Sequence, residues 1–296
     1  MQLTILGTSA TVPTKNRNHP GYLLTYKAEG LLFDCGEGIQ RQMKLAGISF
    51  SKITRIFLSH WHGDHMLGLP GLLQSRAMHE YTKELKIYGP PGSKLKFKKL
   101  LEAFESSYPI AATMQEVKEG KFLDTKDFYV EAYPLAHRTK CYGFRFVEKD
   151  KRKIKKSALK KLGIPEGPLV GKLQEGKPVT VKGRKIRPED VSTVEKGRVF
   201  AYISDTRPNK NCHKLAKNAD ILLCESTYST EHKRKAEEYY HMTAQEAAQI
   251  ASQCNAKKLI LTHFSARYKD ESVLEKDART VFDNTLAAKD FMKITF

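Results

Sequence analysis

The sequence predicts a mixed α/β protein with one compact core and one inserted basic segment. Short apolar runs typical of strands alternate with longer segments of helical pattern along most of the 296 residues. That alternation is interrupted over residues 151–195, where lysines and Gly/Pro punctuation replace it. A chain of this length suits one large domain. We therefore expect a single domain over 1–296 that carries an inserted, flexible arm at 151–195.

The first half of the chain begins with strands and continues with alternating helices and strands. Apolar strand patterns that end near Gly, Asp or Ser occupy residues 3–6, 22–25, 31–33 and 55–58. Helical patterns follow at 68–80 and 94–106, on either side of a strand at 85–88 and a Gly-Pro-Pro-Gly turn at 89–92. These segments predict an N-terminal sheet followed by helices that alternate with strands.

The second half continues this alternation on both sides of the arm. Strand patterns occupy residues 128–136, 141–147, 199–203, 221–224 and 259–261. A helix is expected over 243–254, because Thr243 and Glu246 have the spacing of a capping box. Two mixed β/α halves fit this layout.

Positive charge is the main compositional bias of the chain. Lysine and arginine number 51 against 33 Asp and Glu, which gives a net charge of +18 at pH 7. Residues 151–187 alone hold 13 Lys and Arg but only Glu166 and Glu175 as acids, and they begin with a Lys-rich helical pattern. Such a concentration of charge indicates a polyanionic partner. The alternative is a solvated Lys-rich helix and loop.

Cysteine usage and hydropathy argue against several other classes of protein. The five cysteines are odd in number and widely spaced, without a C-x-x-C pair, so we expect free thiols rather than a redox couple or a thiolate zinc site. No apolar run approaches the roughly 18–20 residues of a spanning helix, and the chain does not begin with a basic and then apolar leader. We expect a cytoplasmic protein that does not enter a membrane.

The sharpest chemical feature is a Ser-His-Trp-His-Gly-Asp-His segment directly after a predicted strand. It offers three imidazoles and a carboxylate, the mixed donor set that zinc binds while keeping a position open for water. A tight turn at Gly63 lets these donors face two metals. His60 and His62 can then point at one metal, and Asp64 and His65 can point at a second. The alternative is a surface histidine cluster.

Three further candidate ligands follow predicted strands: His137, Asp205 and His263. Strand ends that line one edge of a sheet are the usual place for a site in α/β architecture. Taken singly, each residue has an alternative role in a turn or a hydrogen bond. Together with the His-rich segment they supply enough ligands for two metal sites.

The order of these residues resembles the metallo-β-lactamase superfamily. The H-x-H-x-D-H segment followed by separate His, Asp and His positions carries the resemblance, and Phe-Asp-Cys-Gly-Glu-Gly at 33–38 is similar to the superfamily's early D-x-G turn. It implies a four-layer αβ/βα sandwich with two zinc ions per subunit, manganese being the alternative metal. The implied ligands are His60, His62 and His137 for one zinc and Asp64, His65 and His263 for the other, with Asp205 as the bridge and Asp34 supporting the ligands.

Narrower motifs resemble the tRNase Z branch of this superfamily, also called ribonuclease Z, in its short form. Pro-Thr-Lys-Asn-Arg-Asn at 13–18 matches the branch's P-x-K-x-R-N loop. Ser-Asp-Thr-Arg at 204–207 is similar to its G-D-T-R segment, with Ser in place of Gly. Glu225 and His241 fall in two further motifs, although Cys precedes Glu225 where the branch has His, and Met follows His241 where the branch has Ser.

The resemblance implies a zinc-dependent endoribonuclease that removes 3′ trailers from precursor tRNA. Hydroxide activated by two zinc ions would attack the phosphodiester in line and leave a tRNA 3′-OH and a trailer 5′-phosphate. Asp64 would accept the proton of the attacking water. His241 would protonate the leaving 3′ oxygen, with Glu225 as its orienting partner.

The same resemblance implies two groups of RNA-binding residues and a homodimer. The two groups are Lys15, Arg17, Asn18 and Arg207 near the cleaved end, and Lys153, Lys155, Lys156, Lys160 and Lys161 in the arm. Lysine and arginine bind phosphates without reading base sequence. In short members of the branch, the arm of one subunit holds tRNA for the site of the other.

Two rival functions stay open on the sequence alone. A dinuclear-zinc hydrolase of small esters or thioesters, glyoxalase-II-like or lactonase-like, needs the metal ligands but neither the P-x-K-x-R-N loop nor a basic arm. A non-catalytic RNA-binding protein of the same fold needs the basic arm but usually loses ligands, whereas every expected ligand position is filled here.

Overall fold

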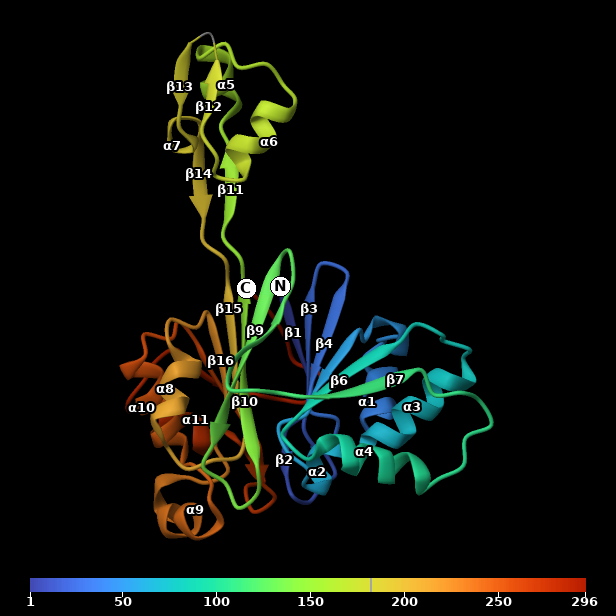
Figure 1. The fold of residues 1–296 in the computed structure, drawn as a ribbon. Coiled ribbons are helices and arrows are strands. Elements are labelled where there is room, and N and C mark those ends of the chain that lie inside the picture. The colour runs from blue at the N-terminus through green and yellow to red at the C-terminus, as the bar shows by residue number, and fades with distance from the viewer. Residues whose placement is uncertain (182) are drawn as a thin grey trace. The chain divides into compact units, whose positions relative to one another are not determined.

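The computed structural model describes residues 1–181 and 183–296, and its chain divides into two compact units (Figure 1). The main unit comprises Met1–Asp124, Val130–Phe146 and Val199–Phe296. The insert unit comprises Thr125–Tyr129 and Val147–Arg198. The arm expected at 151–195 falls within the insert unit, except for residue 182, which lies outside the described residues.

The first sheet of the main unit has seven strands, in the order β20-β1-β3-β4-β5-β6-β7. These are β20 (Lys293–Thr295), β1 (Gln2–Gly7), β3 (Gly21–Tyr26), β4 (Glu29–Phe33), β5 (Arg55–Phe57), β6 (Leu85–Gly89) and β7 (Ala112–Glu116). The strands from β4 to β7 run parallel, and most side chains of β4 to β6 are buried. Continuous apolar runs of this kind are typical of parallel strands that are covered on both faces.

The second sheet also has seven strands, in the order β19-β17-β16-β15-β10-β9-β8. These are β19 (Thr285–Ala287), β17 (Leu259–Thr262), β16 (Ile221–Glu225), β15 (Val199–Ile203), β10 (Cys141–Glu148), β9 (Phe128–Leu135) and β8 (Gly120–Asp124). The strands β15, β16, β17 and β19 run parallel. Their carboxyl ends therefore lie at the same edge of the sheet.

Helices cover the outer face of each sheet (Figure 1). The first sheet carries α1 (Ile39–Leu45), α3 (Gly68–Met78) and α4 (Ser93–Glu102), with η1 (Phe50–Lys52) and α2 (Gly63–Met66) in its connections. The second carries α8 (Lys210–Ala216), α10 (Ala244–Gln253) and α11 (Ser272–Arg279), with η2 (Thr230–His232) and α9 (Lys233–Tyr239) between β16 and α10. The order helix, sheet, sheet, helix is the four-layer arrangement that the resemblance implies.

Aromatic rings from both sheets pack together in the core. The Phe33 ring lies 5.0 Å from the Phe57 ring of the same sheet and 5.2 Å from the Phe200 ring of the other, measured between centroids. The Phe57 ring also lies 5.5 Å from that of Phe144 in the second sheet. All four side chains are fully buried, so the two sheets share one hydrophobic core.

Most expected elements are present, with shifted ends. The helix expected at 94–106 spans Ser93–Glu102, and the one at 68–80 spans Gly68–Met78. The capping box is confirmed at α10: the Glu246 amide donates to Thr243 Oγ1 over 3.2 Å, and the Thr243 amide donates to the Glu246 carboxylate over 2.9 Å. No helix formed by the described residues is long and apolar enough to span a membrane.

The insert unit is a small folded body with its own core. Its elements are β11 (Lys151–Ile154), α5 (Lys156–Lys161), α6 (Pro168–Gln174), β12 (Val179–Val181), β13 (Arg184–Ile186), α7 (Pro188–Val191) and β14 (Ser192–Glu195). Leu159, Leu173 and Val191 are among the residues buried between them. The expected helical start is wrong in one respect, because residues 151–154 form a strand paired with β14. That partner lies far along the chain, so the local pattern could not reveal it.

Candidate metal centre

Four loops that follow strands of the main unit bring the candidate ligands together. The His-rich loop follows β5, and its Asp64 and His65 lie within the short helix α2, whose N-cap is His62. His137 follows β9, Asp205 follows β15, and His263 follows β17 in a left-handed conformation with φ 60°. A single helical turn after His62 separates the directions of the ligands before and after Gly63, which strand alternation would not do.

The first ligand cluster consists of His60, His62, His137 and Asp205. His60 Nε2 lies 3.0 Å from His62 Nδ1, and His137 Nε2 lies 3.3 Å from the same atom. Asp205 Oδ2 lies 3.6 Å from His60 Nε2 and 3.9 Å from His137 Nε2. Three imidazole nitrogens and one carboxylate oxygen thus converge on one point.

The second cluster consists of Asp64, His65 and His263, and Asp205 reaches it as well. His65 Nε2 and His263 Nε2 lie 3.1 Å apart, and each is 3.5 Å from Asp64 Oδ2. Asp205 Oδ1 lies 3.5 Å from His65 Nε2 and 3.4 Å from His263 Nε2. One oxygen of Asp205 therefore faces each cluster, which is the arrangement of a bridging ligand.

Hydrogen bonds fix the tautomer of three of these histidines. His65 Nδ1 donates to the Asp34 carboxylate over 2.8 Å, and His137 Nδ1 donates to the Tyr240 carbonyl over 3.1 Å. His263 Nδ1 donates to Thr227 Oγ1 over 3.0 Å, since that hydroxyl itself donates to Glu225. Each Nε2 is left as a lone pair that points into the clusters.

These residues fit bound divalent cations. Imidazole lone pairs about 3 Å apart repel one another unless a positive charge lies between them. Asp205 Oδ1 is buried and has no hydrogen-bond partner among the described residues, although such an atom normally has one. Asp64 adds a carboxylate oxygen that lies 3.5 Å from both His65 Nε2 and His263 Nε2, so the second cluster also holds an oxygen donor. The donor set of imidazole and carboxylate suits zinc.

Asp34 supports the His-rich loop through several hydrogen bonds. It is fully buried, directly after β4, with φ 56° in the left-handed region. Its carboxylate accepts from the Ser59 amide over 2.7 Å, from the Ser59 hydroxyl over 2.8 Å and from the Tyr202 hydroxyl over 2.6 Å, besides His65. Asp34 thereby holds both the backbone and a ligand of the metal loop in place.

His241 and Glu225 form a pair beside the ligands. His241 Nδ1 lies 3.0 Å from Glu225 Oε1 and 4.0 Å from Asp205 Oδ2. Glu225 is fully buried and also accepts from the Thr206 amide over 2.9 Å. Burial acts to lower the pKa of His241, but the Glu225 carboxylate and its hydrogen bond raise that pKa to about 9. The ring is therefore oriented by Glu225 and carries a proton that it can donate.

Arg207 is occupied by contacts inside the protein. Its guanidinium forms a two-pronged ion pair with Glu246 and donates to the carbonyl of His241. These contacts tie His241 to the N-terminus of α10. They give Arg207 a positioning role, and its expected contact with substrate stays a prediction.

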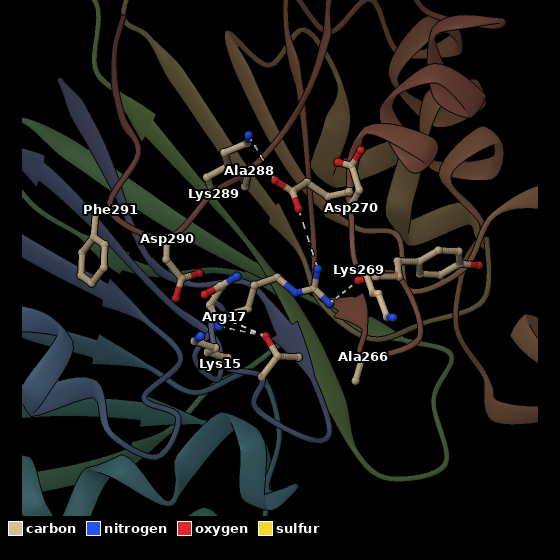
Figure 2. Close-up of a pocket in the computed structure, with 13 residues that line it drawn as sticks. Lys15, Arg17, Ala266, Lys269, Asp270, Ala288, Lys289, Asp290 and Phe291 are labelled. Carbon is tan, nitrogen blue, oxygen red and sulfur yellow. Dashed lines mark hydrogen bonds and ion pairs between the residues drawn. The ribbon is translucent and has the colours of Figure 1, made fainter.

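A cavity of about 780 Å³ lies beside the 13–17 loop (Figure 2). Lys15 is exposed there, whereas Arg17 is buried and donates to the Tyr268 carbonyl over 2.7 Å. Asn18 also bonds internally, since its side chain donates to the Glu37 carbonyl over 2.8 Å. Three residues before Thr14 of the cavity lining, the Thr11 amide donates to Asp64 Oδ2 over 2.8 Å.

The sequence reasoning missed several supporting residues. Ser59, Tyr202, Thr227 and the carbonyl of Tyr240 all hold metal ligands or Asp34. Ser59 and Thr227 adjoin the recognised motifs, and this adjacency was the available signal. Tyr240 contributes a backbone atom, which no side-chain pattern can indicate.

Comparison with known proteins supports one family across the whole chain. A family model described as Anti-Pycsar protein Apyc1 matches residues 1–155, and one described as a beta-lactamase superfamily domain matches residues 183–264. Ribonuclease Z of Archaeoglobus fulgidus is 41% identical over 300 residues, covering 99% of this chain and 97% of the relative. The chain belongs to the ribonuclease Z family. Ribonuclease Z of Bacillus subtilis strain 168 is likewise 40% identical over 304 residues, covering 99% of this chain and 98% of the relative.

Solved structures agree with the fold, and one of them is a tRNase Z. The crystal structure of human tRNase Z, short form, matches with a TM-score of 0.71 at 29% identity, covering 100% of this chain and 99% of that one. The metallo-beta-lactamase fold protein YhfI from Bacillus subtilis matches with a TM-score of 0.72 at 21% identity, covering 99% and 98%. The fold class and family expected from the sequence are confirmed, and ribonuclease Z membership makes the chain a hydrolase and an endoribonuclease.

Proposed function

We propose that this chain removes 3′ trailers from precursor tRNA with two bound zinc ions. Membership of the ribonuclease Z family supports the reaction. The observation that supports the two-metal form is Asp205, whose two carboxylate oxygens face two separate histidine clusters. A single-metal site would leave one of these buried oxygens without a partner.

The two clusters indicate which residues would bind each of the two ions. His60, His62 and His137 would hold the first ion, Asp64, His65 and His263 would hold the second, and Asp205 would be their shared ligand. When bound, the two ions supply an activated water and positive charge at the phosphoryl oxygens. Manganese can fill the same imidazole and carboxylate donors, so the metal that supports activity is part of the test below.

The protein residues around the ions handle the protons. Asp64, whose carboxylate lies 3.5 Å from His65 Nε2 and His263 Nε2, would accept the proton of the attacking water. His241 has its Nδ1 on Glu225, so its Nε2 is the atom that would give a proton to the leaving 3′ oxygen. Arg207 keeps this ring in place through the His241 carbonyl and Glu246. The products are a tRNA 3′-OH and a trailer 5′-phosphate.

Two basic regions bind the substrate. Near the cut, Lys15 lies exposed at the cavity, with Arg17 and Asn18 fixing the backbone of its loop. In the insert unit, Lys153, Lys155, Lys156, Lys160 and Lys161 are all exposed. These five lysines grip the tRNA by its phosphates and shape, and in a homodimer they serve the active site of the second subunit.

The test of this function is incubation with a 3′-extended precursor tRNA under zinc or manganese. The wild type should release a trailer with a 5′-phosphate, and Asp64→Ala should leave the substrate uncut. A substrate that already ends in CCA serves as a comparison. An intact precursor after incubation with the metal-loaded wild type would contradict the proposal, and hydrolysis of a thioester in its place would favour a small-ester hydrolase.

A further inference from the structure

Beside the metal centre, Arg138, Tyr239 and Tyr240 form an exposed cluster that the mechanism above does not use. The Arg138 guanidinium lies 5.5 Å from the centroid of the Tyr239 ring and 5.7 Å from that of the Tyr240 ring. Its Nη2 also donates to the Glu238 carbonyl over 2.6 Å, which fixes the guanidinium in place. Tyr239 and Tyr240 are each 44% exposed. Large aromatic side chains held in place yet open to solvent suit a binding surface.

This cluster is joined to the reacting groups through the backbone. Arg138 directly follows the ligand His137, and Tyr240 directly precedes His241. The Tyr240 carbonyl accepts from His137 Nδ1 over 3.1 Å, and the His137 and His241 rings lie 5.4 Å apart. The backbone of Tyr240 therefore lies directly beside the groups that a phosphodiester at the metal clusters would contact.

Tyr240 has a conformation that favours glycine. It ends α9 at φ 61° and ψ 46°, in the left-handed region where a tyrosine is strained and where glycine most often ends a helix. With 44% of its surface exposed, the residue gains less from burial than a core tyrosine would, which leaves the strain only partly offset. Backbone strain at an exposed residue beside reacting groups suggests a function for the side chain.

We infer that Arg138, Tyr239 and Tyr240 form a stacking platform for the base of the last nucleotide that is retained in the tRNA. Aromatic rings and arginine planes stack on unpaired bases whatever their identity. The platform adjoins His241, which donates its proton to the 3′ oxygen of that same nucleotide, so its base is the one nearest to the rings. The inference rests on the proposed function and adds a substrate contact to it.

The test uses a variant that removes the Tyr240 ring and relieves the backbone strain at that position. Tyr240→Gly keeps the carbonyl that holds His137 and suits φ 61°, so zinc content should not change. Tyr240→Phe keeps the ring without the hydroxyl. Tyr108→Ala removes a tyrosine of equal exposure, 44%, away from the ligands, and is the matched control. The readouts are KM and kcat for 3′-extended precursor tRNA, and zinc content.

On the intact substrate, Tyr240→Gly should raise KM about tenfold with a smaller change in kcat, since stacking on one base is removed. Tyr240→Phe should stay close to wild type, and Tyr108→Ala should match it. For the wild type, a precursor that lacks only the base of the last retained nucleotide should raise KM by a similar factor. Tyr240→Gly should cost little more on that abasic substrate, because the substrate has no base there to stack.

If the loss from Tyr240→Gly and the loss from the missing base add up on the abasic substrate, the inference is overturned. The effect of Tyr240→Gly would then come from folding or metal binding. Equal KM values for Tyr240→Gly and wild type would overturn it as well. A loss in Tyr240→Phe as large as in Tyr240→Gly would assign the effect to the hydroxyl instead of the ring. A wild type that leaves the intact precursor uncut overturns the proposed function and this inference together, which distinguishes that failure from the others.

Discussion

At the scale of the residue, the metal centre depends on how each ligand is held. Asp205 reaches both clusters, and the Nδ1 atoms of His65, His137 and His263 are tied to acceptors from three different loops. A ligand whose ring cannot turn loses little entropy when a metal binds. The supporting residues should therefore affect metal affinity almost as clearly as the ligands.

Asp205→Asn should remove metal from both sites. The amide keeps the shape of the carboxylate but lacks the charge that two cations require, so zinc per chain should fall well below two. Cleavage should fall by more than the roughly 10–100-fold typical of a supporting residue. Zinc measured by atomic emission, beside single-turnover cleavage, checks this expectation. Full zinc content in Asp205→Asn would show that the residue is no bridge.

Thr227→Val should lower the zinc affinity of the second cluster without leaving a cavity in the core. The hydroxyl that links His263 Nδ1 to Glu225 is removed while the shape is kept, so zinc affinity should fall about 10–100-fold. Thr227→Ser restores the hydroxyl and should restore the affinity. Competition with a chelator measures both. If Val and Ser bind zinc equally well, the hydroxyl does not hold His263.

Asp290 should make stability depend on pH. Burial raises the pKa of this carboxyl to about 6 from an ordinary 3.8, although bonds from Asn18 and Thr8 act the other way. The folded state thus binds the proton more tightly than the unfolded state. The stabilisation is complete below about pH 3.8 and is lost as pH rises through about 6, by at most about 3 kcal/mol.

The variant Asp290→Asn cannot ionise, so it should gain stability relative to wild type between pH 4.5 and pH 7.5. Urea unfolding of both proteins at the two pH values measures the difference. Because every other residue is the same in both proteins, the pH dependence of the rest of the chain cancels in the comparison. A constant difference between the two pH values would contradict the raised pKa.

At the scale of the element, strands and caps were the predictable part of the fold. The strands β1, β3, β4, β15 and β17 were expected from apolar runs between turn residues, and α10 from its capping box. The strand β11 was missed because its partner β14 lies far along the chain. The candidate ligands could be named from the sequence because their types and their strand-end positions are local features, and the structure brings them together. The roles of Arg207 and Tyr240 depend on tertiary contacts that no local pattern encodes.

Thr243→Ala should loosen the start of α10 and, through it, His241. The capping hydroxyl accepts the Glu246 amide, and Glu246 holds Arg207 against the His241 carbonyl. Loss of the cap should cost about 1 kcal/mol of unfolding free energy. It should lower kcat more than it raises KM, while Thr243→Ser stays close to wild type. Unchanged unfolding and kcat in Thr243→Ala would contradict this link.

At the scale of the whole molecule, the candidate metal ligands and the exposed lysines of the arm lie in different units. The main unit carries the candidate metal ligands, and the insert unit carries exposed lysines over a small core of its own. Because that core is separate, surface lysines of the insert unit can be changed without disturbing the ligands. This separation allows substrate binding and chemistry to be tested independently.

Replacement of Lys153, Lys155, Lys156, Lys160 and Lys161 by glutamine should weaken binding of precursor tRNA and leave zinc content unchanged. The logarithm of affinity should fall less steeply with the logarithm of salt, by roughly 0.7–0.9 for each phosphate that the variant no longer neutralises. The same five changes to arginine keep the charge and serve as the control. Affinity measured by filter binding from low to high salt is the readout. An identical salt slope in the glutamine variant would exclude these lysines from RNA binding.

The most direct test of two-metal cleavage is a titration of metal-free protein with zinc. Activity on 3′-extended precursor tRNA should rise and reach a plateau at two zinc ions per chain, with a tRNA 3′-OH and a trailer 5′-phosphate as the only ends. Full activity at one zinc per chain would contradict the role of Asp205 as a bridge. An uncut precursor in the presence of two bound zinc ions would contradict the account as a whole.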